Sequence, residues 1–351
     1  MTTEAHMRRP RLTRRDMPPP HSPLAREEHA GVSIGLNAAI VAVEADEPVA
    51  LVVRDEADIA GGIDGLPFGP FSPLDHRTLE MGLRSWVHEQ TGLEFGYVEQ
   101  LYTFGDRGRH AEPDDRVPHV VSIGYLALTC PGPGRELQRG TWRSWYHFFP
   151  WEDWRKGRPE ILDQEIMPRL KEWAARPQLH TAPARPLMRE ERVRMCFGGN
   201  GAAWDEEKVL ERYELLYEAG LVEEARRDGR ESALLWRDTP RLGAPMRFDH
   251  RRILATAIGR VRAKIKYRPV IFELMPPEFT LYELQKTVEA ILGPHLHKQN
   301  FRRLVESAGL VEPTGEVKTR TGGRPAKLYR YRREVLLERP SPGVRVKPGR
   351  A

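Results

Sequence analysis

The chain has 351 residues, with 55 Lys and Arg against 50 Asp and Glu, a formal net charge of +5 and 40% hydrophobic residues. At roughly 100 to 200 residues per domain, this length predicts two or three domains, and 30 Gly and 30 Pro are too few for a collagen-like or low-complexity chain. Cys130 and Cys196 are the only cysteines, which favours neither a disulfide framework nor a zinc site. No apolar run approaches the ~20 residues of a membrane helix, and the start lacks the apolar core of a signal peptide. We therefore expect a cytoplasmic protein without a membrane segment.

Both ends of the chain have a composition that favours disorder. Residues 1–30 contain five arginines between Arg8 and Arg15 and a run of three prolines at 18–20, which cannot bury enough apolar surface to fold. This basic tail either adds weak contacts to DNA or is a plain flexible terminus. Residues 339–351 predict a second flexible tail.

The first folded region alternates strands with one helix. Apolar and β-branched runs predict strands over residues 36–43, 50–54, 97–104 and 120–128. Before the third strand, Leu79, Leu83, Trp86 and Val87 recur at helical spacing, and Gly92 ends this helix. A mixed α/β domain is predicted.

The next segment, about residues 137–245, is rich in aromatic side chains and helical patterns. Trp142, Trp145, Trp151 and Trp154 lie within thirteen residues, and such a cluster either closes the core of a domain or stacks on an adenine ring. Apolar spacing predicts helices over residues 162–175 and 205–225.

The C-terminal third predicts a helix-turn-helix. A helix over residues 249–266 carries one apolar stripe, and residues 270–272 have the pattern of a short strand. Thr280 and Glu283 form a capping box that opens a second helix, which stops at Gly293. A third helix over residues 297–307 turns basic and amide side chains outward, as a recognition helix in a major groove would.

Two short strands around a basic loop complete a winged helix. The strands are predicted at residues 310–311 and 328–329. Residues 298–333 contain ten basic and three acidic side chains, so the remainder of the chain carries a net charge of −2. A basic segment on a near-neutral protein is typical of contact with phosphates, although a solvated basic face is the alternative.

The order of strand, strand, glycine loop, helix and strand over residues 34–130 resembles the Nudix fold, and the letters HEQTGL at residues 88–93 look like the end of its signature helix. Hydrolytic Nudix enzymes hold divalent ions with several carboxylates on this loop and helix. The six positions that should be Arg-Glu-x-x-Glu-Glu are occupied here by SWVHEQ at residues 85–90, and an upstream glutamate position falls near Arg77. Only Glu89 is in place, and Glu80 lies out of step with the pattern.

This departure predicts that the chain has no catalytic residues, no metal site and no pyrophosphate hydrolase activity. The alternative is a Nudix hydrolase that acts on a nucleoside diphosphate derivative with Glu80 and Glu89 as unusual metal ligands. A pocket without metals could instead bind phosphates through cations. The candidates are Arg77, Arg84, Arg107 and Arg109, and the alternative for each is a solvated surface side chain.

The whole pattern over residues 31–335 resembles the Nudix-related transcriptional regulators of bacterial NAD metabolism, the NrtR and NadQ type. The motifs are FDH at residues 248–250, FTLYELQ at 279–285, NFRR at 300–303 and GRPAKLY at 323–329. The resemblance implies a homodimeric repressor of NAD biosynthesis genes that binds double-stranded DNA at a palindromic operator. It also implies an adenine nucleotide effector (ATP, NAD or ADP-ribose) and no required cofactor. The long segment 137–245 favours the NadQ type.

Carried onto this chain by motif, the resemblance implies two groups of DNA-contacting residues. They are Lys298, Gln299, Asn300, Arg302 and Arg303 in the helix, and Lys318, Arg320, Arg324 and Lys327 in the wing. Asn300 has a second interpretation, as an inward residue that caps the turn.

We therefore expect an α+β protein in which a Nudix-like α/β/α sandwich domain precedes a C-terminal winged helix-turn-helix domain. The expected boundaries are a disordered basic tail at 1–30, a ligand-sensing domain at 31–245, a connector helix at 246–267, the DNA-binding domain at 268–338 and a flexible tail at 339–351.

Overall fold

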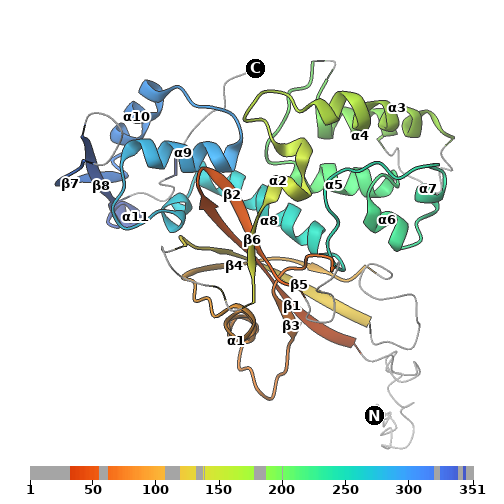
Figure 1. Cartoon of the computed structure of the whole chain (residues 1–351), viewed down its shortest axis with the longest axis horizontal. Helices are drawn as coiled ribbons and strands as arrows, with labels where there is room; N and C mark the ends of the chain where they lie inside the picture. Colours follow the sequence, from red (N-terminus) through yellow and green to blue (C-terminus); the bar gives the residue numbers. More distant parts are fainter. Residues whose placement is uncertain are drawn as a thin grey trace, which may run out of the picture.

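The computed structural model describes residues 32–54, 62–106, 119–131, 137, 139–177, 187–199, 201–319, 325–338 and 343–344. The predicted basic tail at 1–30 lies outside these residues. Figure 1 shows a sheet with α1 (Leu79–Thr91) on one side and the other helices on the opposite side. Within the described ranges, no helix is both long and apolar enough to cross a bilayer.

The sheet is mixed, as a Nudix-like domain requires. Its order is β4-β5-β1-β2-β6, and β3 also pairs with β1. The strands are β1 (Val32–Glu44), β2 (Glu47–Val52), β3 (Phe68–Pro70), β4 (Tyr97–Phe104), β5 (His119–Leu128) and β6 (Thr141–Ser144). Only the β1–β5 pair is parallel among these. The four predicted strands are confirmed, whereas β3 and β6 are further strands that were not predicted from the sequence.

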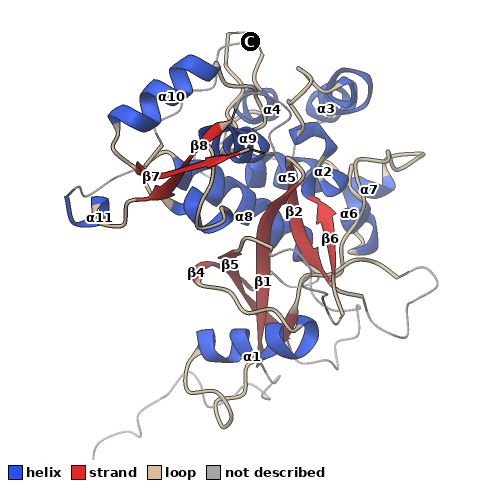
Figure 2. Ribbon diagram, turned by 60° about the vertical axis from the view of Figure 1, so that its left-hand side comes forward, coloured by secondary structure: helices blue, strands red, loops and turns tan. Residues whose placement is uncertain are grey.

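Strand β1 is buried on both faces because helices cover both sides of the sheet. Ala38 and Ile40 lie in a core with Leu83 and Val87 of α1. Ala39 and Val41 alternate to the other face, where a larger core reaches the winged helix. Helix α1 begins where Thr78 Oγ1 accepts from the Met81 amide at 3.1 Å, and it ends at Gly92, whose φ is 70°. These layers confirm the expected α/β/α sandwich (Figure 2).

The segment after β6 forms a helical insertion. Its helices are α2 (Trp145–Phe148), η2 (Pro150–Glu152), η3 (Leu162–Ile166), α3 (Met167–Ala175), α4 (Arg189–Phe197), α5 (Val209–Glu218), α6 (Glu223–Arg227) and α7 (Glu231–Leu234). The helix expected over 205–225 is confirmed over α5, but it does not continue to residue 225, because the chain turns at Gly220 with φ of 75°. A Cβ there would lie 2.4 Å from the Ala233 amide nitrogen, so the turn also permits close packing of α7.

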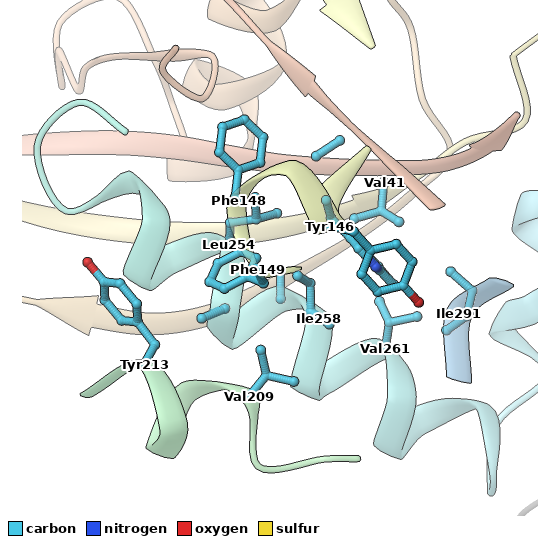
Figure 3. Packing of buried hydrophobic residues seen from close by; sticks show 14 of the residues in the cluster. Val41, Tyr146, Phe148, Phe149, Val209, Tyr213, Leu254, Ile258, Val261 and Ile291 are labelled. Carbon is cyan, nitrogen blue, oxygen red and sulfur yellow. The ribbon is translucent and has the colours of Figure 1, made fainter. Parts of the chain in front are cut away.

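The aromatic cluster of this segment is core. Trp145, Trp151, Phe148 and Phe149 are completely buried. Figure 3 shows Phe148 and Phe149 between the sheet and α8 (His250–Ile265), near Tyr213 of α5. The interpretation of the cluster as core is therefore confirmed for these four side chains.

The C-terminal elements form a winged helix that packs on the insertion and the sheet. They are η4 (Val270–Leu274), α9 (Leu281–Leu292), α10 (Lys298–Ser307), β7 (Val311–Lys318), β8 (Ala326–Tyr331) and α11 (Val335–Glu338). The strand expected at 270–272 is wrong: the Phe272 amide donates to the Pro269 carbonyl at 3.2 Å, and this turn places Val270, Ile271 and Leu274 in the core. A run of three apolar residues cannot by itself distinguish a strand from a helical turn.

One part of the predicted flexible tail is packed. Val344 is fully buried, and its amide donates to the Ile265 carbonyl at the end of α8 at 2.9 Å. The expectation of a flexible tail over the whole of 339–351 is therefore wrong at this residue.

Candidate nucleic-acid interface and ligand pocket

Side-chain hydrogen bonds fix both ends of α9, the start of the helix and the turn that leads to α10. The Thr280 hydroxyl accepts from the Glu283 amide at 3.2 Å, and the Glu283 carboxylate accepts from the Thr280 amide at 2.8 Å, which confirms the capping box. At the other end, Gln285 donates to the Leu296 carbonyl at 2.9 Å, and Glu289 accepts from the Leu296 amide at 2.9 Å. The angle at which α10 leaves α9 is thereby fixed.

Glu289 is ionised in this setting. Burial acts to raise the pKa of its carboxyl, but hydrogen bonds from the Leu296 amide and from Gln285, Lys286 and His295 lower it below the usual value. A carboxylate with this many donors favours its charged form. Glu289 is thus a turn-organising residue that the sequence analysis did not single out.

Helix α10 has one buried side and one exposed basic side. Phe301 and Val305 are buried against the core. The five predicted contact residues on this helix are exposed: Lys298, Gln299, Asn300, Arg302 and Arg303. The alternative of an inward Asn300 is therefore wrong. Arg303 points most directly away from the core, because it lies half a turn from the midpoint of Phe301 and Val305.

The wing is attached to the start of α9. Phe279 and Tyr329 exchange backbone hydrogen bonds of 3.0 and 2.8 Å, which pin β8 beside the capping box. Lys318 forms an ion pair with Glu283 and is still 45% exposed. Lys327 is exposed. The predicted contacts Arg320 and Arg324 lie outside the described residues.

Two of the four candidate ligand arginines, Arg77 and Arg84, lie within the described residues. Arg77 is exposed just before the cap of α1. Arg84 donates to Glu80 at 2.9 Å and to the Phe95 and Gly96 carbonyls at 2.5 and 3.1 Å, so its guanidinium ties α1 to the following loop. Arg107 and Arg109 lie outside the described ranges.

A hollow of about 460 Å³ adjoins Arg84. It is lined by Arg84, Ser85, His88, Leu93, Glu94 and Phe95. The Arg84 guanidinium stacks over the Phe95 ring at 4.9 Å. Since its donors are already directed at carbonyl oxygens and Glu80, Arg84 shapes this hollow more than it offers a cation to a phosphate.

The opposite flank of α1 carries the two signature positions that have lost their carboxylates. Gln90 donates to the Phe68 carbonyl at 2.6 Å and accepts from the Phe68 amide at 3.1 Å. The Trp86 indole donates to the Pro70 carbonyl at 2.8 Å. A Cβ on Gly69 would lie 2.2 Å from the Trp86 ring. These side chains bind β3, so this flank of the helix is used for packing and backbone recognition.

The remaining acids on α1 are dispersed. Glu80 pairs with Arg84, while Glu89 is exposed and accepts a long hydrogen bond from Ser85 at 3.4 Å. Within the part of the chain that the structure describes, no three His, Cys, Asp or Glu side chains are grouped as a metal site would need. The missing acids are evident in the sequence, but the contacts of Trp86 and Gln90 with β3 are not. Gly69, a small residue facing a tryptophan, is the signal that could have indicated them.

Comparison with known proteins gives a local match in the C-terminal domain. The family described as the NrtR DNA-binding winged helix domain matches residues 271–331. A protein of Acinetobacter baylyi, the "ADPR responsive transcriptional repressor NtrR", is 46% identical over 84 residues, which cover 24% of this chain and 33% of the repressor. The chain thus aligns with only about a third of the length of this curated relative.

Two solved structures are similar over a larger share of the chain. Shewanella oneidensis NrtR in complex with a 27mer DNA has a TM-score of 0.49 and 20% identity, with 86% of this chain and 94% of that chain covered. A MutT/nudix family protein of Enterococcus faecalis has a TM-score of 0.48 and 16% identity, with 88% and 89% covered. The mixed sheet with its signature-like helix and the matched C-terminal segment lead to one conclusion: the chain joins a Nudix-like α/β domain to a C-terminal domain that matches the NrtR DNA-binding winged helix family over residues 271–331.

Proposed function

We propose that this protein is a DNA-binding transcriptional repressor whose Nudix-like domain senses an adenine nucleotide. The observation that carries the proposal is the winged helix at 271–331, in which the exposed side of α10 presents three cations and two amides. Cations and amides of this kind contact phosphates and base edges in a major groove. The assignment to NAD biosynthesis genes follows the resemblance to regulators of NAD metabolism.

The proposed DNA partner is a palindromic operator bound by a homodimer. Winged helix and helix-turn-helix proteins commonly place two recognition helices about one DNA turn, roughly 34 Å, apart. The proposed contacts are Lys298, Gln299, Asn300, Arg302 and Arg303 on α10, with Lys318 and Lys327 from the wing. Arg320 and Arg324 stay predictions from the sequence.

ADP-ribose is the first effector to test. The support is the repressor of Acinetobacter baylyi, which is described as ADPR responsive. ATP and NAD remain in the test because they share the adenine nucleotide part, and because the segment 137–245 favours the NadQ type.

We further propose that the Nudix-like domain binds its nucleotide without hydrolysing it. Support comes from the flank of α1, where Trp86 and Gln90 bind the β3 backbone at positions that should supply metal ligands. Phosphate hydrolysis by a Nudix enzyme depends on several carboxylates around divalent ions. Incubation of ADP-ribose and NAD with the protein and Mg²⁺ or Mn²⁺ should give no products by mass spectrometry, whereas turnover would support the hydrolase that uses Glu80 and Glu89.

The deciding experiment is a fluorescence anisotropy titration of the full chain. Labelled duplexes from upstream of the organism's NAD biosynthesis genes are compared with scrambled duplexes at physiological salt, alone and with ADP-ribose, NAD or ATP. Preference for one duplex that changes with one nucleotide is the expected result. Equal, weak binding that disappears as salt rises would contradict the proposal, because it would mark α10 as an unspecific basic surface.

A further inference from the structure

Helix α8 is held at both ends by buried polar contacts, one end to the Nudix-like domain and the other to the winged helix. It runs from His250 to Ile265, and eleven of its sixteen residues are buried. A helix of this length is about 24 Å long at 1.5 Å per residue. Its two ends therefore contact different parts of the molecule, the first end residues 64–70 and the second end α9.

The first end is joined to residues 64–70, which we call the strap. His250 Nδ1 accepts a hydrogen bond from the Leu66 amide at 3.0 Å, and the Arg247 amide donates to the Asp64 carbonyl at 3.0 Å. The Phe68 ring packs edge-on against Phe248 and His250, at 5.5 and 5.2 Å between centroids. The strap thus follows any movement of the beginning of α8.

The backbone at this end is strained. Phe248 has a φ of 47°, in the left-handed region that bulky residues rarely adopt. Strain of this kind persists only where surrounding contacts hold it, and it is common in segments that switch. Here Arg227 supplies such contacts, since it donates to the carbonyls of Met246 and Phe248 at 2.8 and 2.7 Å.

The other edge of the strap is bound to α1. Gln90 pairs with both backbone groups of Phe68, and Trp86 donates to Pro70. A ligand that shifts α1 therefore acts on the strap through these hydrogen bonds. Through Leu66, the strap passes that shift to His250.

The second end of α8 is joined to α9 by a buried guanidinium. Arg262 Nε donates to the Ile291 carbonyl at 2.9 Å, and its Nη1 donates to Glu152 at 2.6 Å. Glu152 also accepts from Arg212 of α5 at 2.6 Å. All three side chains are at most 1% exposed. An Arg–Glu–Arg group in a core adds little net stability compared with apolar packing, and its better-documented use is to fix one arrangement of neighbouring elements.

We propose that α8 couples the surface of α1 to the placement of α9 and α10, with His250 and Arg262 as the positioning residues at its two ends. This inference rests on the proposed function, because it names the route by which a nucleotide bound to the Nudix-like domain changes operator affinity. His250 is completely buried and Arg262 is 1% exposed, so neither side chain is offered to a ligand or to DNA. Both residues act by holding the strap, α8 and α9 in a fixed position relative to one another. The nucleotide and the operator DNA then favour either the same arrangement of these elements or different ones.

The test measures the coupling ratio, which we define as the ratio of the two operator Kd values, with and without saturating ADP-ribose, taken so that it exceeds one. Wild-type full-length protein is compared with His250→Leu, which removes the acceptor for the Leu66 amide, and with Arg262→Lys, which keeps the charge but loses the forked geometry. His250→Asn is the conservative variant, since its side-chain oxygen can replace Nδ1 as acceptor. Arg260→Ala is the matched control on the same helix, where Arg260 is 31% exposed and pairs with Glu99.

The expected wild-type ratio is about 5- to 150-fold, the usual range of allosteric coupling. In His250→Leu and Arg262→Lys the ratio should fall below about twofold, while the Kd for ADP-ribose alone and for the operator alone stay close to wild type. His250→Asn and Arg260→Ala should keep the wild-type ratio. A merely structural role would instead weaken both separate affinities together.

Two results would overturn the inference, and they differ. Full coupling in both His250→Leu and Arg262→Lys, with the wild type responding to nucleotide, would remove the role of α8 and leave the proposed function intact. A wild type that binds no operator, or whose operator affinity ignores the tested nucleotides, would overturn the proposed function and the inference with it.

Discussion

The arginines of the winged helix and those of the helical core have opposite surroundings. On α10, Arg302 and Arg303 are exposed. In the core, Arg212, Arg251 and Arg262 are at most 1% exposed, and each pairs with a buried glutamate. Burial of a charge is costly unless it is paired and hydrogen-bonded. One residue type thus forms an exposed basic surface in one region and a polar framework for helix packing in the other.

This difference explains why the basic residues of the winged helix could be recognised from the sequence and the buried arginines of the core could not. The basic excess at 298–333 stands out as a run along the chain. The core arginines are spread over 51 positions, from 212 to 262. Their partners Glu152 and Glu224 lie between 27 and 110 positions away from them in the sequence. Substitutions that remove a partner in the core should therefore act on stability, and those on α10 should act on DNA.

The largest effect is expected at Glu152. Glu152→Ala leaves Arg212 and Arg262 buried without their shared carboxylate, and loss of one partner of a buried pair costs about 3–5 kcal/mol. Urea denaturation followed by circular dichroism measures the loss. The matched control is Glu172→Ala, because Glu172 is 61% exposed in its pair with Arg176 and should cost at most about 1 kcal/mol. Equal losses in both variants would contradict the contrast between core and surface.

The lowered pKa of Glu152 predicts that the stability of the protein depends on pH. Burial acts to raise the pKa of Glu152, but Arg212 and Arg262 together hold it below its ordinary value of 4.5. A carboxyl with a lowered folded-state pKa contributes stability that is present above the unfolded-state pKa and lost as pH falls through the folded-state pKa. The free energy of unfolding should therefore decrease below about pH 4.5. In Glu152→Gln, urea titrations should show a shallower decrease; an identical acid slope in both proteins would exclude Glu152 as its source.

On the exposed side, Arg303→Ala should weaken operator binding by about 1–3 kcal/mol, if its guanidinium contacts a base edge. Arg302 lies nearer the edge of this face. Arg302→Ala should therefore lower affinity for operator and scrambled duplexes alike, and the slope of log affinity against log salt concentration should decrease by about one. Anisotropy titrations at several salt concentrations separate the two effects. Lys171→Ala, an exposed substitution on α3, is the control and should change neither quantity.

The close contact between Gly69 and Trp86 provides a test of packing at the surface of α1 that faces β3. Gly69→Ala would place a Cβ 2.2 Å from the Trp86 ring, and overpacking of this kind costs typically about 1–3 kcal/mol. Trp86→Leu in the same chain should recover part of that loss, because the smaller side chain vacates the contact. Thermal unfolding of the two single variants and the double variant tests this, and strictly additive losses would mean that the two residues do not compete for space.

The smallest effect is expected at the cap of α9. Thr280→Ala removes the hydroxyl that accepts from the Glu283 amide, which should cost about 1 kcal/mol of stability. Thr280→Ser retains the hydroxyl and should stay close to wild type. Denaturant midpoints of the two variants give the comparison, and a loss in Thr280→Ser as large as in Thr280→Ala would assign the effect to the lost methyl group.

The features that the sequence determined are local. Strand β4, helix α1 with its end at Gly92, and the capping box of α9 follow from residues within a few positions of each other. The same holds for the buried and exposed sides of α10, because helical spacing alone assigns them. Propensities, caps and periodicity act over one or two turns, and for this reason they can be recognised without knowledge of the fold.

The features that only the tertiary structure decided depend on partners distant in the sequence. Strand β6 forms because β2 offers its edge, and the helix expected over 205–225 breaks where α7 approaches Gly220. Arg84 became a structural donor to Phe95 and Gly96, although its sequence setting also suited a phosphate. Side chains with several donors or acceptors, such as Arg84, Glu152 and His250, are used according to which polar groups the fold brings within about 3 Å, and no sequence spacing encodes that distance.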